Sequence, residues 1–89
     1  MKSVFQNDFF KYLEKLPDQA QMQTKRALVL WRKNAFHPSL QFKATKTKGS
    51  IWSIRIGRQY RALALRETET VEWFWVGHHA EYMKLLNRL

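Results

Sequence analysis

Residues suited to proton transfer lie close together near the C-terminal end, in the run Gly77-His78-His79-Ala80-Glu81-Tyr82. A histidine between a strand and a helix titrates near neutral pH, so it can take and give protons at a reacting group. The structural interpretation is that one histidine starts the helix and the other is exposed. Successive side chains diverge and no third ligand is spaced to join them, so we expect neither a metal nor another cofactor.

Cationic side chains on predicted strands are the second group that could do chemistry. In residues 52–56 the even-numbered positions are apolar, while Ser53 and Arg55 are polar. If the apolar side chains face the core, Ser53 and Arg55 face the other way, and Lys43 on the preceding strand joins them. These side chains would then line the sheet face opposite the two long helices.

Arg61, on the third predicted strand, has an ambiguous position. Leu63 and Leu65 follow it at the spacing of one strand face and are apolar. Burying an arginine without a partner is costly, so we expect Arg61 on the polar face beside Arg55.

The charge balance indicates a polyanionic partner. The 89 residues include 16 Lys and Arg against 7 Asp and Glu, a formal net charge of +9. Neutralising phosphates releases counterions and drives association with nucleic acid, although an acidic protein would use the same field. A solvated basic surface is the third interpretation. It is the default for the basic face of the second helix, with contact to rRNA or DNA as the alternative; that face is formed by Lys25, Arg26, Arg32 and Lys33.

Composition excludes several classes of protein. There is no cysteine, which rules out a disulfide scaffold, a thiolate zinc site and a cysteine nucleophile. No apolar run approaches a membrane span, and residues 1–15 lack the apolar stretch of a signal peptide. We expect one cytoplasmic domain over residues 1–89. The aromatic residues 73–75 could stack on bases, but in so small a chain we favour packing.

Hydrophobic spacing predicts two helices in the first half. Apolar residues recur every three or four positions at Phe5, Phe9, Tyr12, Leu13 and Leu16. Pro17 suits the first turn of a second helix, which should end between Asn34 and Phe36 because Pro38 disfavours helical geometry before it.

The second half alternates as strands do. Alternation predicts strands at 40–44, 52–56, 60–66 and 71–76, with turns at 47–50, 57–59 and 67–70. Gly77 should end the last strand, and residues 80–89 return to helical spacing. The predicted fold class is α+β, with an N-terminal helical hairpin packed on a four-stranded antiparallel sheet and a short C-terminal helix.

The chain resembles the short RelE/ParE-type toxins of bacterial type II toxin–antitoxin modules in the runs HPSLQFKATKTKGSIWSIRIGRQYRALAL and VEWFWVGHHAEYMKLL. The earlier run LEKLPDQAQ, leading into a basic helix, is similar to their helical hairpin. The resemblance is specific because the Tyr-Arg pair on the third strand and the Gly-x-His-x-x-Tyr junction occur together. It implies a concave basic cleft that is neutralised by an antitoxin whose tail wraps the toxin.

In the mRNA-cleaving branch, the resemblance implies a toxin that enters the ribosomal A site and cuts mRNA without a metal. The RNA 2′-hydroxyl attacks the adjacent phosphate and leaves a 2′,3′-cyclic phosphate. By position, Arg61 and Arg55 match cationic family positions, His79 falls where members place Arg or His, and Tyr82 would stack on a base or orient the scissile site. The predicted catalytic residues are therefore Arg55, Arg61, His79 and Tyr82. The predicted nucleic-acid-binding residues are Lys43, Lys46, Lys48, Arg58 and His78.

Two departures from the family pattern leave the target open. Ser53 stands where some mRNA-cleaving members carry a second lysine, and Tyr82 follows His79 more closely than the terminal aromatic does in some relatives. The alternative is a ParE-like toxin that binds and inhibits DNA gyrase, needs no histidine at the junction and relies on its helical hairpin. An inactive relative or a plain nucleic-acid-binding module is a third possibility. The expected partners are a cognate antitoxin with the ribosome and mRNA, or DNA gyrase, and no membrane.

Overall fold

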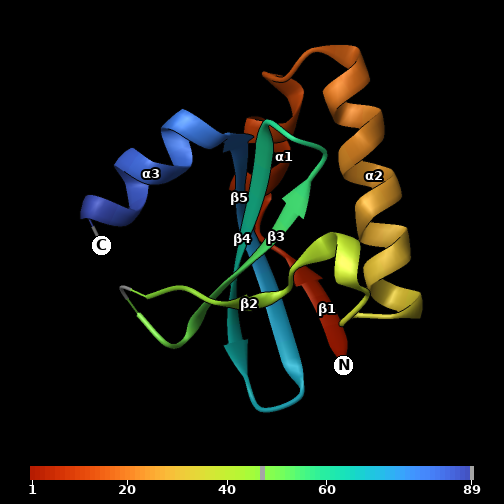
Figure 1. The fold of residues 1–89 in the computed structure, drawn as a ribbon, viewed down its shortest axis with the longest axis vertical. Coiled ribbons are helices and arrows are strands. Elements are labelled where there is room, and N and C mark those ends of the chain that lie inside the picture. Colours follow the sequence, from red (N-terminus) through yellow and green to blue (C-terminus); the bar gives the residue numbers. More distant parts are fainter. Residues whose placement is uncertain (47, 89) are drawn as a thin grey trace.

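The structure is a computed structural model that describes residues 1–46 and 48–88. Along the chain the elements are β1 (Lys2–Phe5), α1 (Asn7–Glu14), α2 (Asp18–Lys33), the short 3₁₀ helix η1 (Pro38–Leu40), β2 (Lys43–Ala44), β3 (Ile51–Ile56), β4 (Tyr60–Glu67), β5 (Thr70–His78) and α3 (His79–Arg88) (Figure 1). No helix within these described residues has the length and apolar character to cross a membrane.

The strands form one sheet in the order β1-β5-β4-β3-β2. Neighbouring strands are antiparallel except β1, which runs parallel to β5. The predicted α+β class and the antiparallel pairing of the four predicted strands are therefore confirmed, and the predicted number of four strands is wrong because β1 adds a fifth.

The strand β1 replaces the beginning of the first predicted helix. Phe5 lies four positions before Phe9 and fits a helical period, but Phe5 pairs with Trp73 of β5. The Gln6 amide also donates to the Trp73 carbonyl oxygen at 2.9 Å, so α1 begins only at Asn7. Pairing with a distant strand has overridden the local preference.

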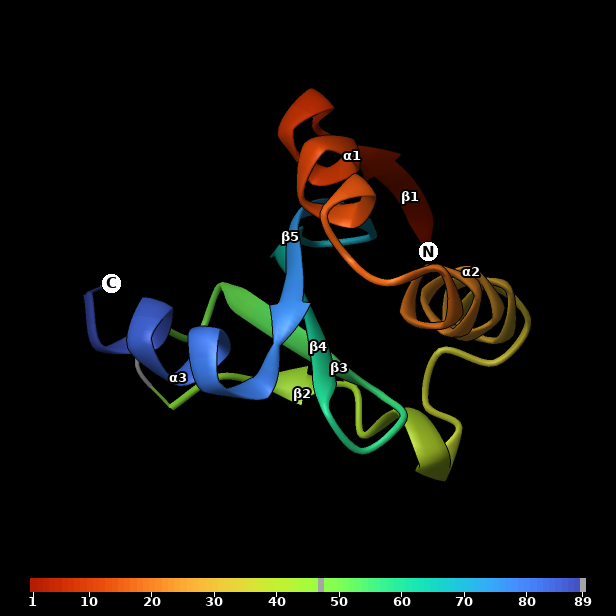
Figure 2. The same cartoon turned by 90° about the horizontal axis from the view of Figure 1, so that it is seen from above.

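Helices lie on both sides of the sheet (Figure 2). The side covered by α1 and α2, called here the hairpin face, holds the larger core. Its buried members are Phe9, Leu13, Trp31, Leu40, Phe42, Ile54, Ile56, Ala62, Ala64, Val71, Trp73 and Val76. The other side, called here the α3 face, holds a smaller core of Ile51, Leu63 and Trp75, on which Tyr82 and Leu85 of α3 pack.

The second helix follows the prediction closely. Pro17 precedes α2, which ends at Lys33, and Ala20, Thr24 and Trp31 are buried along its inner side. The aromatic residues 73–75 also follow the packing interpretation, since Trp73 is fully buried and Trp75 nearly so.

Two strand boundaries differ from the prediction by more than one residue. Strand β2 is short because Pro38 starts η1 and Gln41 adopts a left-handed φ of 47°, so alternation over 40–44 yields only Lys43–Ala44. Strand β5 continues through Gly77 to His78. The predicted turn at 47–50 includes Thr47, and the predicted last helix includes Leu89, both of which lie outside the described residues.

Gly77 is a position where a side chain does not fit. A Cβ there would lie 2.5 Å from Cζ2 of Trp75, whose ring covers it on the α3 face. Overpacking costs about 1–3 kcal/mol, so Gly77→Ala should lower the midpoint of urea unfolding while leaving its slope unchanged. Gly49→Ala is the control, because a Cβ at Gly49 meets nothing within 4 Å. Equal midpoints for the two variants would contradict the expectation.

Candidate functional site

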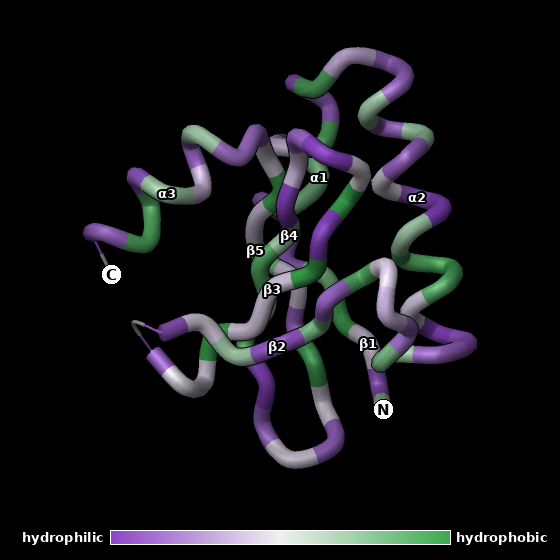
Figure 3. Tube along the Cα trace, viewed as in Figure 1, coloured by the Kyte–Doolittle hydropathy of each residue, from purple (hydrophilic) through white to green (hydrophobic). Residues whose placement is uncertain are grey.

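Strand alternation places the predicted cationic residues on the α3 face. Lys43 lies opposite Ser53, and Ser53 lies opposite Leu63, whose side chain is buried under α3. Two residues beyond Ser53 on β3, Arg55 lies opposite Arg61 of β4. Trp52 and its apolar partners point to the hairpin face. Ser53 and Arg61 therefore both lie on the predicted face, and hydropathy alternates over the last three residues of β3, Ile54 to Ile56 (Figure 3).

Arg55 and Arg61 form a like-charged cross-strand pair. Like charges directly opposite in an antiparallel ladder repel. Within the described residues neither arginine has a carboxylate at ion-pair distance, since the pairs found there are Lys11–Asp8 and Lys84–Glu81. Burial and then the charge of Arg55 lower the pKa of Arg61, while Tyr82 acts in the opposite direction. Arg61 remains a cation at physiological pH, and an anion bound here would relieve the repulsion.

Backbone carbonyl oxygens hold both guanidinium groups in place. Arg61 Nη1 donates to the Tyr60 carbonyl oxygen at 3.0 Å, and Arg55 Nε donates to that of Gly57 at 3.0 Å. Each arginine keeps further N–H donors for a ligand, because a guanidinium carries five.

The start of α3 brings His79 and Tyr82 to the same end of the face. The His79 amide donates to the Gln59 carbonyl oxygen at 2.6 Å, which ties α3 to the turn between β3 and β4. The His79 ring stacks on that of Tyr82, with centroids 6.0 Å apart and an angle of 23°. Tyr82 also influences the pKa of Arg61. The structure thus brings all four predicted catalytic residues to one end of the sheet.

A groove of about 330 Å³ separates β2 and its loop from α3. It is lined by Lys43, Ala44, Thr45, Lys46, Ser53, Tyr82, Met83, Leu86 and Asn87. The last three were not predicted from the sequence as site residues. Their signal is helical spacing, since Leu86 follows Tyr82 by four positions and Asn87 follows Met83 by four.

Two of the remaining predicted binding residues do not line this groove. Lys48 is exposed in the loop between β2 and β3, and Arg58 is exposed in the turn between β3 and β4. Both turns flank the α3 face, and both side chains are open to solvent.

The opposite end of the α3 face is acidic. A hollow of about 190 Å³ is lined by Val4, Leu65, Glu67, Thr70 and Glu72. Its two carboxylates repel phosphate, so the field along the face favours a polyanion at the end that carries Arg61.

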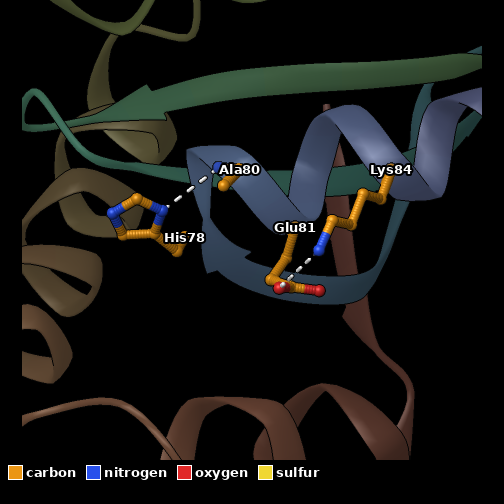
Figure 4. Close-up of polar contacts among 4 residues, drawn as sticks. All are labelled: His78, Ala80, Glu81 and Lys84. Atoms are coloured by element: carbon orange, nitrogen blue, oxygen red, sulfur yellow. Dashed lines mark hydrogen bonds and ion pairs between the residues drawn. The ribbon is translucent and has the colours of Figure 1, made fainter.

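His78 lies on the hairpin face, away from the other predicted residues. It pairs with Tyr60, whose ring belongs to the hairpin core and meets the His78 ring edge to face at 5.7 Å and 83°. The Ala80 amide donates to His78 Nδ1 at 3.1 Å, at the start of α3 and ahead of the Glu81–Lys84 ion pair (Figure 4). His78 is therefore a helix N-cap, and its role in binding nucleic acid stays a prediction.

Removing the cap should weaken α3. We expect His78→Ala to cost about 0.5–2 kcal/mol of unfolding free energy, because the Ala80 amide loses its acceptor. His78→Asn should retain most of the stability, since its side-chain oxygen can accept the same bond. Urea unfolding and hydrogen exchange at the Ala80 amide measure the two effects. Identical exchange rates in both variants would contradict the capping role.

A family model supplies the decisive comparison. The model of the ParE-like toxin domain matches residues 18–84. The chain belongs to the ParE-like toxin family. This confirms the predicted membership of the RelE/ParE superfamily, and the protein is called the toxin from here on. Among curated protein sequences, none matches the toxin.

Solved structures of toxins share the fold. A chain of the RelB–RelE antitoxin–toxin complex from Methanococcus jannaschii is 20% identical with a TM-score of 0.74, covering 92% of this chain and 96% of that one. The YoeB/ParE toxin from Agrobacterium tumefaciens is 15% identical with a TM-score of 0.67, covering 89% and 99%. The isolated RelE toxin of E. coli is 18% identical with a TM-score of 0.64, covering 98% and 96%. At these identities the likeness establishes the fold alone.

In the part of the toxin that the structure describes, no group of three or more histidine, aspartate or glutamate side chains is placed to hold a metal ion.

Proposed function

We propose that the toxin is a ribosome-dependent mRNA endonuclease that blocks translation and cleaves by attack of the RNA 2′-hydroxyl on the adjacent phosphate, without a metal. The observation that carries the proposal is the pair of Arg55 and Arg61, which has no carboxylate at ion-pair distance among the described residues. Tyr82 is close enough to Arg61 to act on its pKa, and His79 stacks on Tyr82. Because its target would be mRNA on translating ribosomes, the toxin would act in the cytoplasm.

This chemistry requires groups that stabilise charge and move protons. The bond from the 2′-oxygen to phosphorus forms as the bond to the 5′-oxygen breaks, which leaves a 2′,3′-cyclic phosphate and a 5′-hydroxyl. Arg61 and Arg55 stabilise the charge that develops on the phosphate oxygens. His79 exchanges a proton with the reacting oxygens, and Tyr82 stacks on a base beside the scissile bond.

The groove supplies the binding surface in this proposal. Lys43 and Lys46 line it and face α3, so they can neutralise phosphates on either side of the scissile bond. Lys48 and Arg58 flank the same face and extend the positive field.

A cognate antitoxin is the expected regulatory partner. The similar chains from Methanococcus jannaschii and Mycobacterium tuberculosis come from toxin–antitoxin complexes. With a net charge of +9, the toxin suits an acidic segment laid along the groove, which would exclude RNA by occupying the arginines.

Inhibition of DNA gyrase is the second candidate function, favoured by the match to the ParE-like family model. That function would use the surface of α1 and α2 and would require no chemistry at His79.

One experiment separates the two candidates. Purified toxin is added to translating ribosomes and the mRNA ends are mapped, while the same preparation is assayed for inhibition of gyrase supercoiling. Cuts phased with codons and ending in cyclic phosphate support the proposal. Intact mRNA together with inhibited supercoiling would overturn it in favour of the second candidate.

A further inference from the structure

A hollow of about 410 Å³ lies outside the groove, at the outer edge of β3. It is lined by Arg26, Ala27, Leu30, Ser39, Leu40, Arg55 and Gly57. The wall on one side is α2, and the opposite wall is η1 with the end of β3. The hollow lies where β2 has ended: β2 pairs only with Trp52 and Ser53, so among the described residues the rest of β3 has a strand, β4, on one edge alone.

The two walls each carry an arginine. Arg26 is exposed on α2, and Arg55 comes from β3. In the described part of the chain neither has an acidic partner at ion-pair distance. Ala27, Leu30 and Leu40 supply apolar surface between the two cations. Two cations separated by an apolar floor fit the phosphate and sugar of a nucleotide.

Arg55 connects this hollow with the site on the α3 face. It lines the hollow, lies opposite Arg61 in the ladder, and its charge acts on Arg61. Arg61, Arg55 and Arg26 therefore form a series of cations that passes from the α3 face around the unpaired edge of β3 to α2.

We propose that the hollow between α2 and η1 binds a backbone phosphate of single-stranded RNA, on the strand that continues from Arg61 across the edge of β3. The proposal rests on the proposed function for the identity of the strand. In this proposal Arg26, which the sequence analysis placed by default on a solvated helix face, binds the RNA at a phosphate distant from the one that reacts.

The test compares two arginines on one helix. Arg26→Gln removes a charge from the hollow, whereas Arg32→Gln removes the same charge from a separate surface beside Met1, Lys2 and Ser3. Binding of the full-length toxin to a fluorescent single-stranded RNA is measured by anisotropy over a series of salt concentrations. Arg26→Gln should weaken binding several-fold more than Arg32→Gln and reduce the slope of log K against log salt by about 0.7. Urea unfolding of both variants checks that the fold is intact.

Equal affinities and slopes for the two variants would overturn the proposal. So would weakened binding of an acidic peptide by Arg26→Gln with RNA binding unchanged, because the hollow would then serve a protein. This binding experiment gives its answer whether or not the toxin cleaves mRNA. If the wild-type toxin leaves mRNA intact while Arg26→Gln still lowers RNA affinity, the endonuclease function fails and the RNA site remains.

Discussion

Arg61→Ala is expected to reduce the single-turnover rate of mRNA cleavage by about 100- to 1000-fold, the usual cost of removing one donor that stabilises transition-state charge. Arg61 is half-buried, and its guanidinium is held by the Tyr60 carbonyl oxygen, so it is fixed before the reaction begins. Because Arg55 repels it, its removal should leave stability unchanged or slightly increased. A loss of activity therefore reports on chemistry and not on unfolding.

Two further variants sharpen this test. Arg61→Lys keeps the charge but loses the planar fork of donors, so an intermediate rate is expected. Arg32→Ala removes a charge from the exposed side of α2 and should cleave like the wild type. Cleavage by Arg61→Ala at the wild-type rate, with ribosome binding intact, would remove this arginine from the reaction.

Trp73→Ala is expected to have the largest effect on stability, about 3–5 kcal/mol. Its side chain is fully buried and meets the Trp31 ring edge to face at 5.4 Å and 86°. Its indole Nε1 donates to Ser3 Oγ at 3.1 Å, which links β5 to β1. Small domains are stabilised by only about 5–15 kcal/mol, so the variant should be largely unfolded in moderate urea.

Two controls separate the causes of this loss. Ser3→Ala removes only the hydrogen-bond acceptor and should cost about 1 kcal/mol. Met22→Ala changes a side chain that is 52% exposed and should fall within about 0.5 kcal/mol of wild type. Urea unfolding monitored by far-UV circular dichroism measures all three variants. A loss of under about 1 kcal/mol in Trp73→Ala would show that the core tolerates the cavity.

Local patterns predict most of this fold, and the exceptions come from distant pairing. Alternation places β3 correctly because Trp52, Ile54 and Ile56 share the hairpin face, which excludes the other register. It does not reveal β1, since four residues that suit a strand also suit the start of a helix, and only β5 decides between them. The left-handed backbone at Gln41 likewise has no signal in the alternation that it interrupts.

The site residues divide in the same way, into those that a local pattern predicts and those that depend on distant elements. The common face of Lys43, Ser53 and Arg55 needs only the pleat of a strand, so the sequence predicts it. The position of His78 on the hairpin face was not predicted, because the strand was expected to end at Gly77. With β5 extended by one residue, alternation from Val76 puts His78 on the hairpin face. The hollow at Arg26 depends on how α2 packs against η1, which no local spacing reports.

The parallel pairing of β1 with β5 has a consequence for the order in which the toxin can be assembled. Lys2 lies opposite Thr70, and the other three strands of the sheet, β2, β3 and β4, are all synthesised between these two. Closing so long a loop costs entropy before it gains contacts, which makes such topologies slow to fold. On the ribosome, β1 emerges before the other strands and has no strand to pair with until β5 has emerged. A growing chain therefore has no complete groove until α3 has also emerged.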